Sequence, residues 1–513
     1  MAERARNLFR KITEEKPWIT AAVLLLAGLI LRLIWLEKLP YGLNQDEAAA
    51  GYDAWALLHG GADRHGNTWP VLFVSWGSGQ NVLMSYLAMP FIALLGLRPL
   101  SIRLPNALAG CVSLFVLWRF ARRARGEKFG LCALFLLVIN PWHIMASRWG
   151  LESNLLPALL LGACGFLSLA EKKPKALLGA AVCLGLSPYA YGTVFFLLPP
   201  FLIWTAIRLR KSFRPGPALA SLLLFLVLVF PIGLCQALNI LGGEELRVLG
   251  ITFPRLIDVR QNATSILGGG GLSALRKNLM VFLEILHNGD DGVEYNALPF
   301  WQGGILYFFG LPLAALGFLT SLLKDSGRKT EWPMLAQLCC SVFCAVLMDG
   351  NINRLNMVWI PMIYYSAVGS FWLVRRLEIS GLIPSAAALL CFAFFVSSYV
   401  SGFTTPGHYK YYPGLGEAIA AAEEREPKTL YISGTVRQPY IFALFYTTPS
   451  PERFRQSAEF GTDLDGVMQT VARFDGFEFE DPEKADLWIL RQDEAQEQGR
   501  EVMAAYGLYA VCR

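Results

Sequence analysis

The sequence Arg119-Phe120-Ala121-Arg122-Arg123-Ala124-Arg125-Gly126-Glu127-Lys128 lies at the junction of two long apolar segments, 104–121 and 128–146. Half of its residues are Lys or Arg. Short loops that are rich in Lys and Arg stay on the cytoplasmic side of a membrane. The stretch therefore predicts two membrane-spanning helices joined on the cytoplasmic face, and it sets the sidedness of the segments around it.

Further basic clusters alternate with apolar segments along the rest of the chain. They fall within residues 4–16, 172–175, 208–214, 324–329 and 375–376. If all of these clusters are cytoplasmic, the loops between them face the outside. The carboxylates and remaining arginines that could carry chemistry gather in those outer loops, so we expect the function to reside there.

The apolar segments predict an all-α polytopic membrane protein, because about 20 apolar residues cross a bilayer. Segment 81–97 is apolar but short and contains Pro90. If it crossed, the basic stretch 119–128 would move outside, so we expect an interfacial or re-entrant segment. With the N-terminus inside, we expect about eleven crossings, at 18–36, 104–121, 128–146, 153–170, 175–187, 193–210, 217–235, 305–323, 332–348, 355–374 and 382–400.

Charge and cysteine content narrow the function. The formal net charge of +5 is explained by the inner loops, so no nucleic-acid partner is expected. Nine of the ten cysteines lie in or beside apolar segments, which is typical of packing residues rather than of disulfides or a zinc site. No nucleotide-binding motif occurs in a supporting context, so the energy for an outer-face reaction must arrive within the substrate.

Two domains are expected. Residues 1–400 form the transmembrane domain, with long outer loops at 37–103 and 236–304, and loops of this length are usually functional. Residues 401–513 change to a mixed polar composition and predict a small extracytoplasmic α/β domain. Within it we expect helices at 417–424 and 439–446 and strands at 429–433 and 487–490.

Asp46 and Glu47 stand shortly after the first crossing and are the candidate catalytic residues. A carboxylate in a partly desolvated cleft has a raised pKa and can take a proton from an attacking hydroxyl. Adjacent carboxylates could also bind a cation. The structural alternative is a helix N-terminus with Asn44 as its cap, and both interpretations can hold together.

Arg103, Arg148 and Arg354 each stand at an outer helix end and are candidates for binding a lipid-linked phosphate. Each could instead extend its charge to lipid headgroups, and Arg148 could pair with Glu152 along one helix. Glu152 and Asn353 accompany Arg148 and Arg354 as candidate substrate-binding residues.

The other candidates are His143, Tyr189 and Tyr191, at outer segment ends. His143 has no second His or Cys in its loop, which favours an interfacial histidine over a metal ligand. The tyrosines could stack on a sugar or hydrogen-bond a phosphate, although aromatic residues also form belts at membrane interfaces.

The chain resembles the GT-C glycosyltransferases, in particular bacterial relatives of protein O-mannosyltransferases, aminoarabinose transferase and galacturonic-acid transferases. The resemblance covers about residues 18–375. It rests on the following segments: 42–48, Gly51-Tyr52, 63–66, Trp69-Pro70, 101–108, Asn140-Pro141-Trp142-His143 with Arg148, and Asn353-Arg354. A Lys-Pro-Pro segment that many relatives carry before the second crossing is replaced here by residues 77–81.

The resemblance implies a plasma-membrane enzyme that moves a sugar from a polyprenyl-phosphate carrier to an acceptor on the outer face, with inversion. The acceptor would be a cell-envelope glycan, lipid or protein. Asp46 matches the acid that acts as base or positions the acceptor, with Glu47 its neighbour. No obligatory metal is expected, because the loop lacks a clear DxD, although some relatives use a divalent cation. A transporter or flippase of lipid-linked sugars is the alternative, but no internal repeat supports it.

Overall fold

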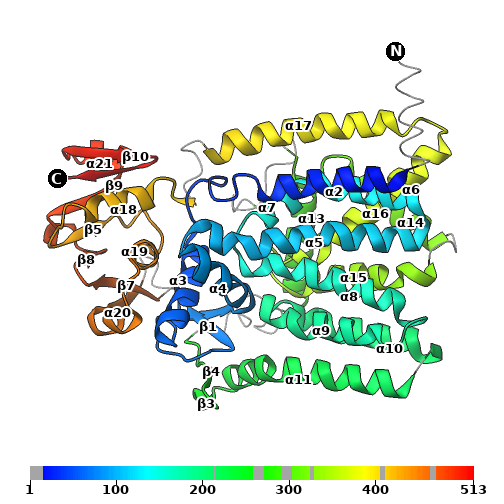
Figure 1. Cartoon of the computed structure of the whole chain (residues 1–513), viewed down its shortest axis with the longest axis horizontal. Helices are drawn as coiled ribbons and strands as arrows, with labels where there is room; N and C mark the ends of the chain where they lie inside the picture. The colour runs from blue at the N-terminus through cyan, green and yellow to red at the C-terminus, as the bar shows by residue number, and fades with distance from the viewer. Residues whose placement is uncertain are drawn as a thin grey trace.

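The computed structural model describes residues 16–212, 214–257, 271–289, 291, 303–323, 328–404, 411–462 and 469–513. A helical part carries, at one end, parts of the two loops predicted to face out, 37–103 and 236–304, and a C-terminal α/β domain (Figure 1). By that prediction the loops are called the first and second outer loops below. This architecture agrees with the fold class predicted from the sequence. The domain boundary predicted at residue 400 stays a prediction, because the last apolar helix continues to Thr404 and residues 405–410 lie outside the described residues.

Each of the eleven predicted crossings contains a helix. The helices are α2 (Pro17–Leu33), α5 (Pro99–Arg125), α6 (Glu127–Val138) with α7 (Pro141–Ser147), η2 (Glu152–Leu155) with α8 (Leu156–Ala170), α9 (Ala176–Ala190), α10 (Val194–Leu209), α11 (Pro215–Ile240), α14 (Gly310–Leu323), α15 (Arg328–Leu347), α16 (Asn356–Arg376) and α17 (Leu382–Thr404).

Not all of these helices are long enough to cross a bilayer alone. Within the described ranges, six are long and apolar enough: α5, η2 with α8, α11, α15, α16 and α17. The pair α6–α7, bent by 62°, makes a seventh if it counts as one span. The shorter apolar helices include α2, α9 and α14. The chain is therefore a multi-pass membrane protein, while the count of eleven crossings stays a prediction.

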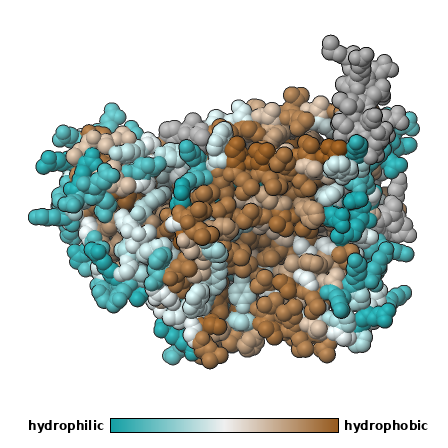
Figure 2. Space-filling model, viewed as in Figure 1, coloured by the Kyte–Doolittle hydropathy of each residue, from teal (hydrophilic) through white to brown (hydrophobic). Residues whose placement is uncertain are grey.

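The surface is divided into bands that suit a bilayer. Figure 2 shows a broad hydrophobic zone over the helical part, with hydrophilic surfaces at both ends. The outermost helices, α11 and α17, are strongly apolar. In the most apolar 18-residue stretch of each, only 17% is buried inside the protein. Such exposed apolar helices are stable in contact with lipid acyl chains rather than with water.

A buried polar cluster joins four helices at the end away from the C-terminal domain. Arg125 donates two hydrogen bonds to Glu331, of 2.8 and 2.6 Å, and a third to Ser321 Oγ over 2.7 Å. Tyr364 donates its hydroxyl to Glu331 Oε2 over 2.7 Å. Because a bidentate Arg–carboxylate pair fixes both distance and orientation, this cluster holds α5, α14, α15 and α16 in register.

The first outer loop contains α3 (Gln45–Gly60), the hairpin β1 (Leu72–Ser75) and β2 (Ser78–Asn81), and α4 (Leu83–Leu95). The hairpin was not expected from the sequence. The second loop contains the hairpin β3 (Leu246–Val248) and β4 (Ile251–Phe253) and the helix α13 (Gly271–Asn288). The two loops are joined by backbone hydrogen bonds, including Val71 N to Thr252 O over 3.1 Å.

The C-terminal domain is built on a seven-stranded mixed sheet of order β10-β11-β9-β5-β8-β7-β6. The central strand β5 is parallel to both neighbours, β8 and β9. All four predicted elements of this domain are present, as α18, α19, β5 and β9. The bounds are α18 (Leu415–Glu423), β5 (Leu430–Ile432), α19 (Pro439–Thr447), α20 (Pro451–Ser457), β6 (Glu459–Thr462), β7 (Gln469–Phe474), β8 (Phe477–Glu478), β9 (Leu487–Arg491), α21 (Gln492–Glu497), β10 (Val502–Tyr506) and β11 (Tyr509–Cys512).

The C-terminal domain packs directly on the first outer loop. Gly42 has a φ of +90°, and a Cβ atom at this position would overlap the carbonyl oxygen of Tyr411. Leu43 N donates to the same oxygen over 2.6 Å. Tyr41 and Tyr52 also reach the domain, by hydrogen bonds to Glu417 and to the carbonyl of Pro449. Only glycine fits at position 42, so the close approach of the loop at Gly42 to the chain at Tyr411 depends on this residue.

Candidate functional site

Helix α3 begins where the candidate acidic pair stands. Asn44 caps it by accepting a hydrogen bond from Asp46 N, and Glu47 closes a capping box by accepting from Asn44 N over 3.1 Å. The cap predicted as the structural alternative is therefore present. It orients the two neighbouring carboxylates differently: Glu47 turns into the protein, whereas Asp46 stays partly exposed.

Glu47 is completely buried and is saturated by protein donors. Arg103 donates from Nε to Glu47 Oε1 over 2.9 Å and from Nη2 to Oε2 over 3.2 Å. Gly150 N donates to Oε1 over 2.8 Å. Together with Asn44 N, these groups engage both carboxylate oxygens. In this conformation Glu47 has no access to a substrate, which places it in a supporting role.

Arg103 is engaged to the same extent. Besides Glu47, its guanidinium donates to the carbonyl oxygens of Leu36, Glu37, Pro40 and Gly42, over 2.7 to 3.3 Å. A guanidinium has five N–H groups, and all five are used. Arg103 therefore has no free N–H group for the phosphate contact that the sequence suggested. Arg103 instead shapes the loop that leads from the first helix to Asp46.

Asp46 is the carboxylate of the pair that remains partly exposed. Trp76 donates its indole N–H to Asp46 Oδ1 over 3.2 Å, and Gln80 Nε2 donates to the backbone oxygen of Asp46 over 3.2 Å. Both partners come from the β1–β2 hairpin. The hairpin therefore fixes the orientation of the Asp46 carboxylate at the start of α3.

A buried ion pair supports this hairpin. Arg64 Nη1 lies 2.6 Å from Asp53 Oδ2, and both side chains are inaccessible to solvent. Arg64 Nη2 donates to Ser75 Oγ over 2.8 Å, and the guanidinium stands over the Trp76 ring, 5.5 Å from its centroid. Burial raises the pKa of the Asp53 carboxyl, and the attraction of Arg64 opposes this shift. The pair thus connects α3 to the residue that contacts Asp46.

Sequence reasoning did not single out Asp53, Trp76 or Gln80, and it assigned no role to Arg64. One signal was available. Asp46 and Asp53 are seven residues apart, which places them on one face of a helix that is otherwise rich in alanine. Trp76 and Gln80 gave no such signal, because their contacts depend on a hairpin that the sequence did not reveal.

His143 and Arg148 lie deep in the protein beside the end of the first helix. Arg148 donates to the carbonyl oxygens of Leu31, Ile34 and Leu39, over 2.8 to 3.0 Å. His143 Nδ1 lies 2.7 Å from Nη2 of Arg32, which is always a donor, so the neutral imidazole carries its proton on Nε2. Both predicted binding residues therefore hold helix ends together, and Arg32 was not anticipated.

Asn81, at the end of β2, connects Glu152 to the end of α9. Asn81 N donates to Glu152 Oε2 over 2.8 Å, and Asn81 Nδ2 donates to the carbonyl of Pro188 over 2.6 Å. Tyr189 donates its hydroxyl to the carbonyl of Leu228 over 2.9 Å, which anchors α11. Tyr191, at the C-cap of α9, is only partly buried. Both predicted tyrosines are thus partly buried.

Asn353 and Arg354 precede α16 and are partly exposed. Arg354 Nη1 donates to the carbonyl of Asp349 over 3.0 Å and lies 3.7 Å from its carboxylate. Nε and Nη2 of Arg354 make no hydrogen bond to any residue that the structure describes. Lys277 of α13 approaches the same carboxylate, at 3.8 Å. Among the three predicted arginines, Arg354 alone keeps exposed surface, with its side chain 25% exposed, whereas Arg103 and Arg148 are buried.

No cluster of three or more His, Cys, Asp or Glu side chains with metal-binding geometry occurs in the part of the chain that the structure describes. The carboxylates nearest to Asp46 in sequence, Glu47 and Asp53, are each paired with an arginine. A divalent ion bound at Asp46 would therefore have to draw on other ligands.

The arrangement of helices, outer loops and C-terminal domain matches a known architecture. A crystal structure of ArnT from Cupriavidus metallidurans with bound undecaprenyl phosphate superimposes with a TM-score of 0.59, covering 96% of this chain and 97% of ArnT at 12% identity. The chain therefore shares the fold of ArnT. The oligosaccharyltransferase of Archaeoglobus fulgidus in its apo form also superimposes, with a TM-score of 0.50, 13% identity, and coverage of 86% of this chain and 64% of that one.

Sequence comparison supports the GT-C assignment over part of the chain. The family model "Dolichyl-phosphate-mannose-protein mannosyltransferase" matches residues 79–234. The Bacillus subtilis (strain 168) protein named "Putative mannosyltransferase YycA" is 30% identical over 153 residues. That match spans 29% of this chain but only 22% of the relative. The predicted resemblance to the GT-C superfamily is confirmed.

Proposed function

We propose that this GT-C protein is a glycosyltransferase that moves a sugar from a polyprenyl-phosphate carrier to an acceptor hydroxyl outside the cytoplasm. The observation that carries the proposal is the partly exposed Asp46, held by Trp76 at the end of the helical part where the C-terminal domain also packs. The ArnT structure contains undecaprenyl phosphate and the family model names a dolichyl-phosphate-mannose donor, which supports a lipid-phosphate-linked sugar as the substrate class.

Asp46 is the proposed general base. Its carboxylate takes the proton of the acceptor hydroxyl while the hydroxyl oxygen attacks the anomeric carbon. The bond between that carbon and the phosphate oxygen breaks, and its electron pair stays on the phosphate. Attack from the face opposite the phosphate inverts the anomeric centre. One carboxylate is sufficient for this reaction, so the buried Glu47 need not touch the substrate.

Arg354 is the proposed anchor of the carrier phosphate. It stands two residues before α16, where the partial positive charge of the helix N-terminus also attracts an anion. Arg354 and Lys277 both lie within 4 Å of the Asp349 carboxylate, and Asp291 accepts a hydrogen bond from Ile352 N in the same turn. The proposed phosphate contact is therefore the exposed guanidinium of Arg354 itself rather than a net positive charge. Charge builds up on the phosphate as the sugar leaves, so cations near it stabilise the transition state more than the ground state.

The purified protein, reconstituted with a radiolabelled polyprenyl-phosphate sugar and a cell-envelope extract, tests the proposal. We expect labelled product from the wild type and a loss of about 10²–10⁴-fold in turnover for Asp46→Asn, the range that general base catalysis contributes. Donor binding should be unchanged in that variant. Transfer should persist in EDTA, since no metal is required by this mechanism. Full activity of Asp46→Asn would remove Asp46 from the chemistry, and movement of label across a vesicle without product would indicate a transporter.

A further inference from the structure

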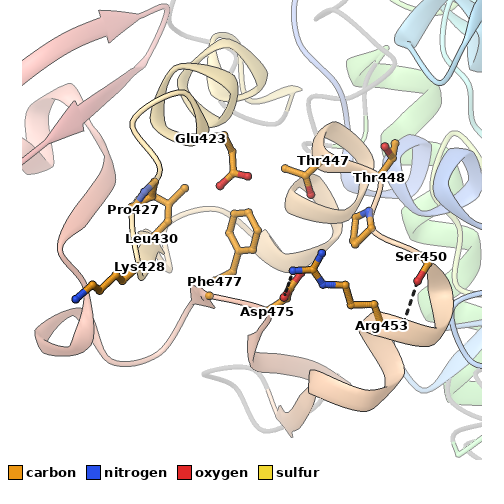
Figure 3. A pocket seen from close by; sticks show the side chains of 12 residues that line it. Glu423, Pro427, Lys428, Leu430, Thr447, Thr448, Ser450, Arg453, Asp475 and Phe477 are labelled. Carbon is orange, nitrogen blue, oxygen red and sulfur yellow. Dashed lines mark hydrogen bonds and ion pairs between the residues drawn. The ribbon is translucent and has the colours of Figure 1, made fainter.

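A polar pocket of about 490 Å³ lies in the C-terminal domain, apart from the residues assigned to catalysis. Figure 3 shows it between α18, the end of α19, the start of α20 and the β7–β8 turn. A volume of a few hundred cubic ångströms is typical of small-molecule sites. Side chains from five separate segments converge on this pocket, and none of them has a role in the mechanism above.

The side chains present groups that suit a polyhydroxylated ligand. Glu423 and Thr447 point toward the ring of Phe477 from different walls, and Arg453 reaches across to Asp475 (Figure 3). Arg453 Nη2 lies 2.7 Å from Asp475 Oδ1. Carboxylates and hydroxyls accept and donate hydrogen bonds to sugar hydroxyls, while the apolar edge of a ring can contact the C–H groups of a sugar.

The charges of the pocket disfavour an anionic ligand. Two carboxylates, Glu423 and Asp475, face one guanidinium, that of Arg453, and the amino group of Lys428 points away (Figure 3). Burial and the neighbouring Asp475 both raise the pKa of Glu423. A phosphate or a uronic acid would meet a lining without excess positive charge, and would therefore bind poorly.

The rim of the pocket holds a residue in a strained conformation. Thr448 ends α19 with φ of +48°, where glycine or asparagine is usual, and its N–H bonds to the carbonyl of Leu444. A β-branched residue in the left-handed region is an outlier, and residues of this kind cluster at ligand sites. Threonine here adds a hydroxyl to the pocket lining at a cost in stability.

The same wall is attached to the helix that begins at the proposed base. Tyr52 of α3 donates its hydroxyl to the carbonyl of Pro449 over 2.7 Å. Tyr52 lies six residues after Asp46, which is about 9 Å along the helix axis. The wall of the pocket is thus attached to α3, the helix that begins beside Asp46.

We propose that this pocket binds a saccharide unit without acidic groups, as a subsite for the acceptor. The assignment to the acceptor rests on the proposed glycosyltransferase function, whereas the binding of a saccharide does not. An anionic occupant, a uronic acid or a phosphate group, is distinguished by the test below.

Saturation-transfer NMR on the full-length protein in nanodiscs is the direct test. The probes are the methyl glycosides of glucose, galactose and mannose, with glucosamine, glucuronic acid and methyl phosphate for comparison. We expect at least one neutral or amino sugar to bind and Glu423→Ala to weaken that binding at least tenfold. Glu424→Ala is the matched control, because Glu424 is the next residue, exposed and outside the pocket lining. Binding of glucuronic acid or methyl phosphate alone, or equal loss in both variants, would overturn the proposal.

Two further measurements separate this inference from the proposed function. Thr448→Gly should raise the thermal unfolding temperature and weaken saccharide binding at least threefold, so its effect on binding cannot come from misfolding. In the transfer assay Glu423→Ala should raise the acceptor KM and leave kcat nearly unchanged. An unchanged KM with normal transfer would refute the subsite but not the enzyme. Saccharide binding without any transfer would refute the enzyme and leave the saccharide site.

Discussion

Arg103 Nε lies 2.9 Å from Glu47 Oε1, and the side chains of both residues are fully buried. This pair turns one carboxylate of the Asp46–Glu47 dipeptide into the protein and leaves the other at the surface of the first outer loop. It also uses every donor of an arginine that the sequence suggested for phosphate binding. The presence of an arginine and a glutamate was thus not enough to assign a binding site, because Arg103 and Glu47 pair with each other to fold the loop.

Removal of Arg103 should destabilise the protein more than removal of an arginine in an exposed pair. Arg103→Ala leaves Glu47 buried without its partner, which typically costs about 3–5 kcal/mol. Arg98→Ala is the control, because its pair with Glu37 is solvent-exposed and such pairs contribute little. Thermal unfolding in detergent should show a large decrease for Arg103→Ala and almost none for Arg98→Ala. Equal stability of the two variants would contradict a structural role for the pair.

The indole of Trp76 should affect turnover rather than folding. Trp76→Phe keeps an aromatic ring but removes the N–H that bonds Asp46 Oδ1. A hydrogen bond to a charged group contributes about 1.5–3 kcal/mol, so we expect kcat to fall about 10- to 100-fold. Trp69→Phe, in the same loop but 49% exposed, should behave like the wild type. If both variants keep full kcat, the hydrogen bond does not orient the base.

Arg354 should determine affinity for the donor. Arg354→Ala removes the exposed guanidinium next to α16 and should weaken donor binding by about tenfold or more, whereas Arg354→Lys should recover part of it. Arg375→Ala is a suitable control, since Arg375 is in the last turn of the same helix, far from the outer loops. Donor binding can be followed by fluorescence of a labelled polyprenyl phosphate. The assignment fails if Arg354→Ala and Arg375→Ala bind the donor equally well.

The sidedness of the site can be tested with engineered thiols. Leu58 on α3 is 39% exposed, and Leu377, beside the last basic cluster, is 57% exposed. A membrane-impermeant maleimide added to intact cells should label Leu58→Cys but label Leu377→Cys only after permeabilisation, above the background of the native cysteines. The reverse pattern would place α3 and Asp46 inside the cell.

The sequence alone predicted the helical architecture, the two long outer loops and the α/β domain. Those features depend on local properties: runs of apolar residues need lipid or a core, and clusters of Lys and Arg resist transfer across a membrane. The N-cap at Asn44 was also foreseeable, because capping involves residues three apart.

Only the tertiary structure decided which of the predicted polar residues stay partly exposed and which are buried. Glu47 and Arg103 are 56 residues apart, and Arg148 reaches the end of a helix more than 100 residues away. Burial and pairing of a charge depend on such long-range contacts, which no local pattern records. Asp46 and Arg354 are the residues proposed for proton transfer and phosphate binding, because folding left them partly exposed while it buried Glu47, Arg103 and Arg148.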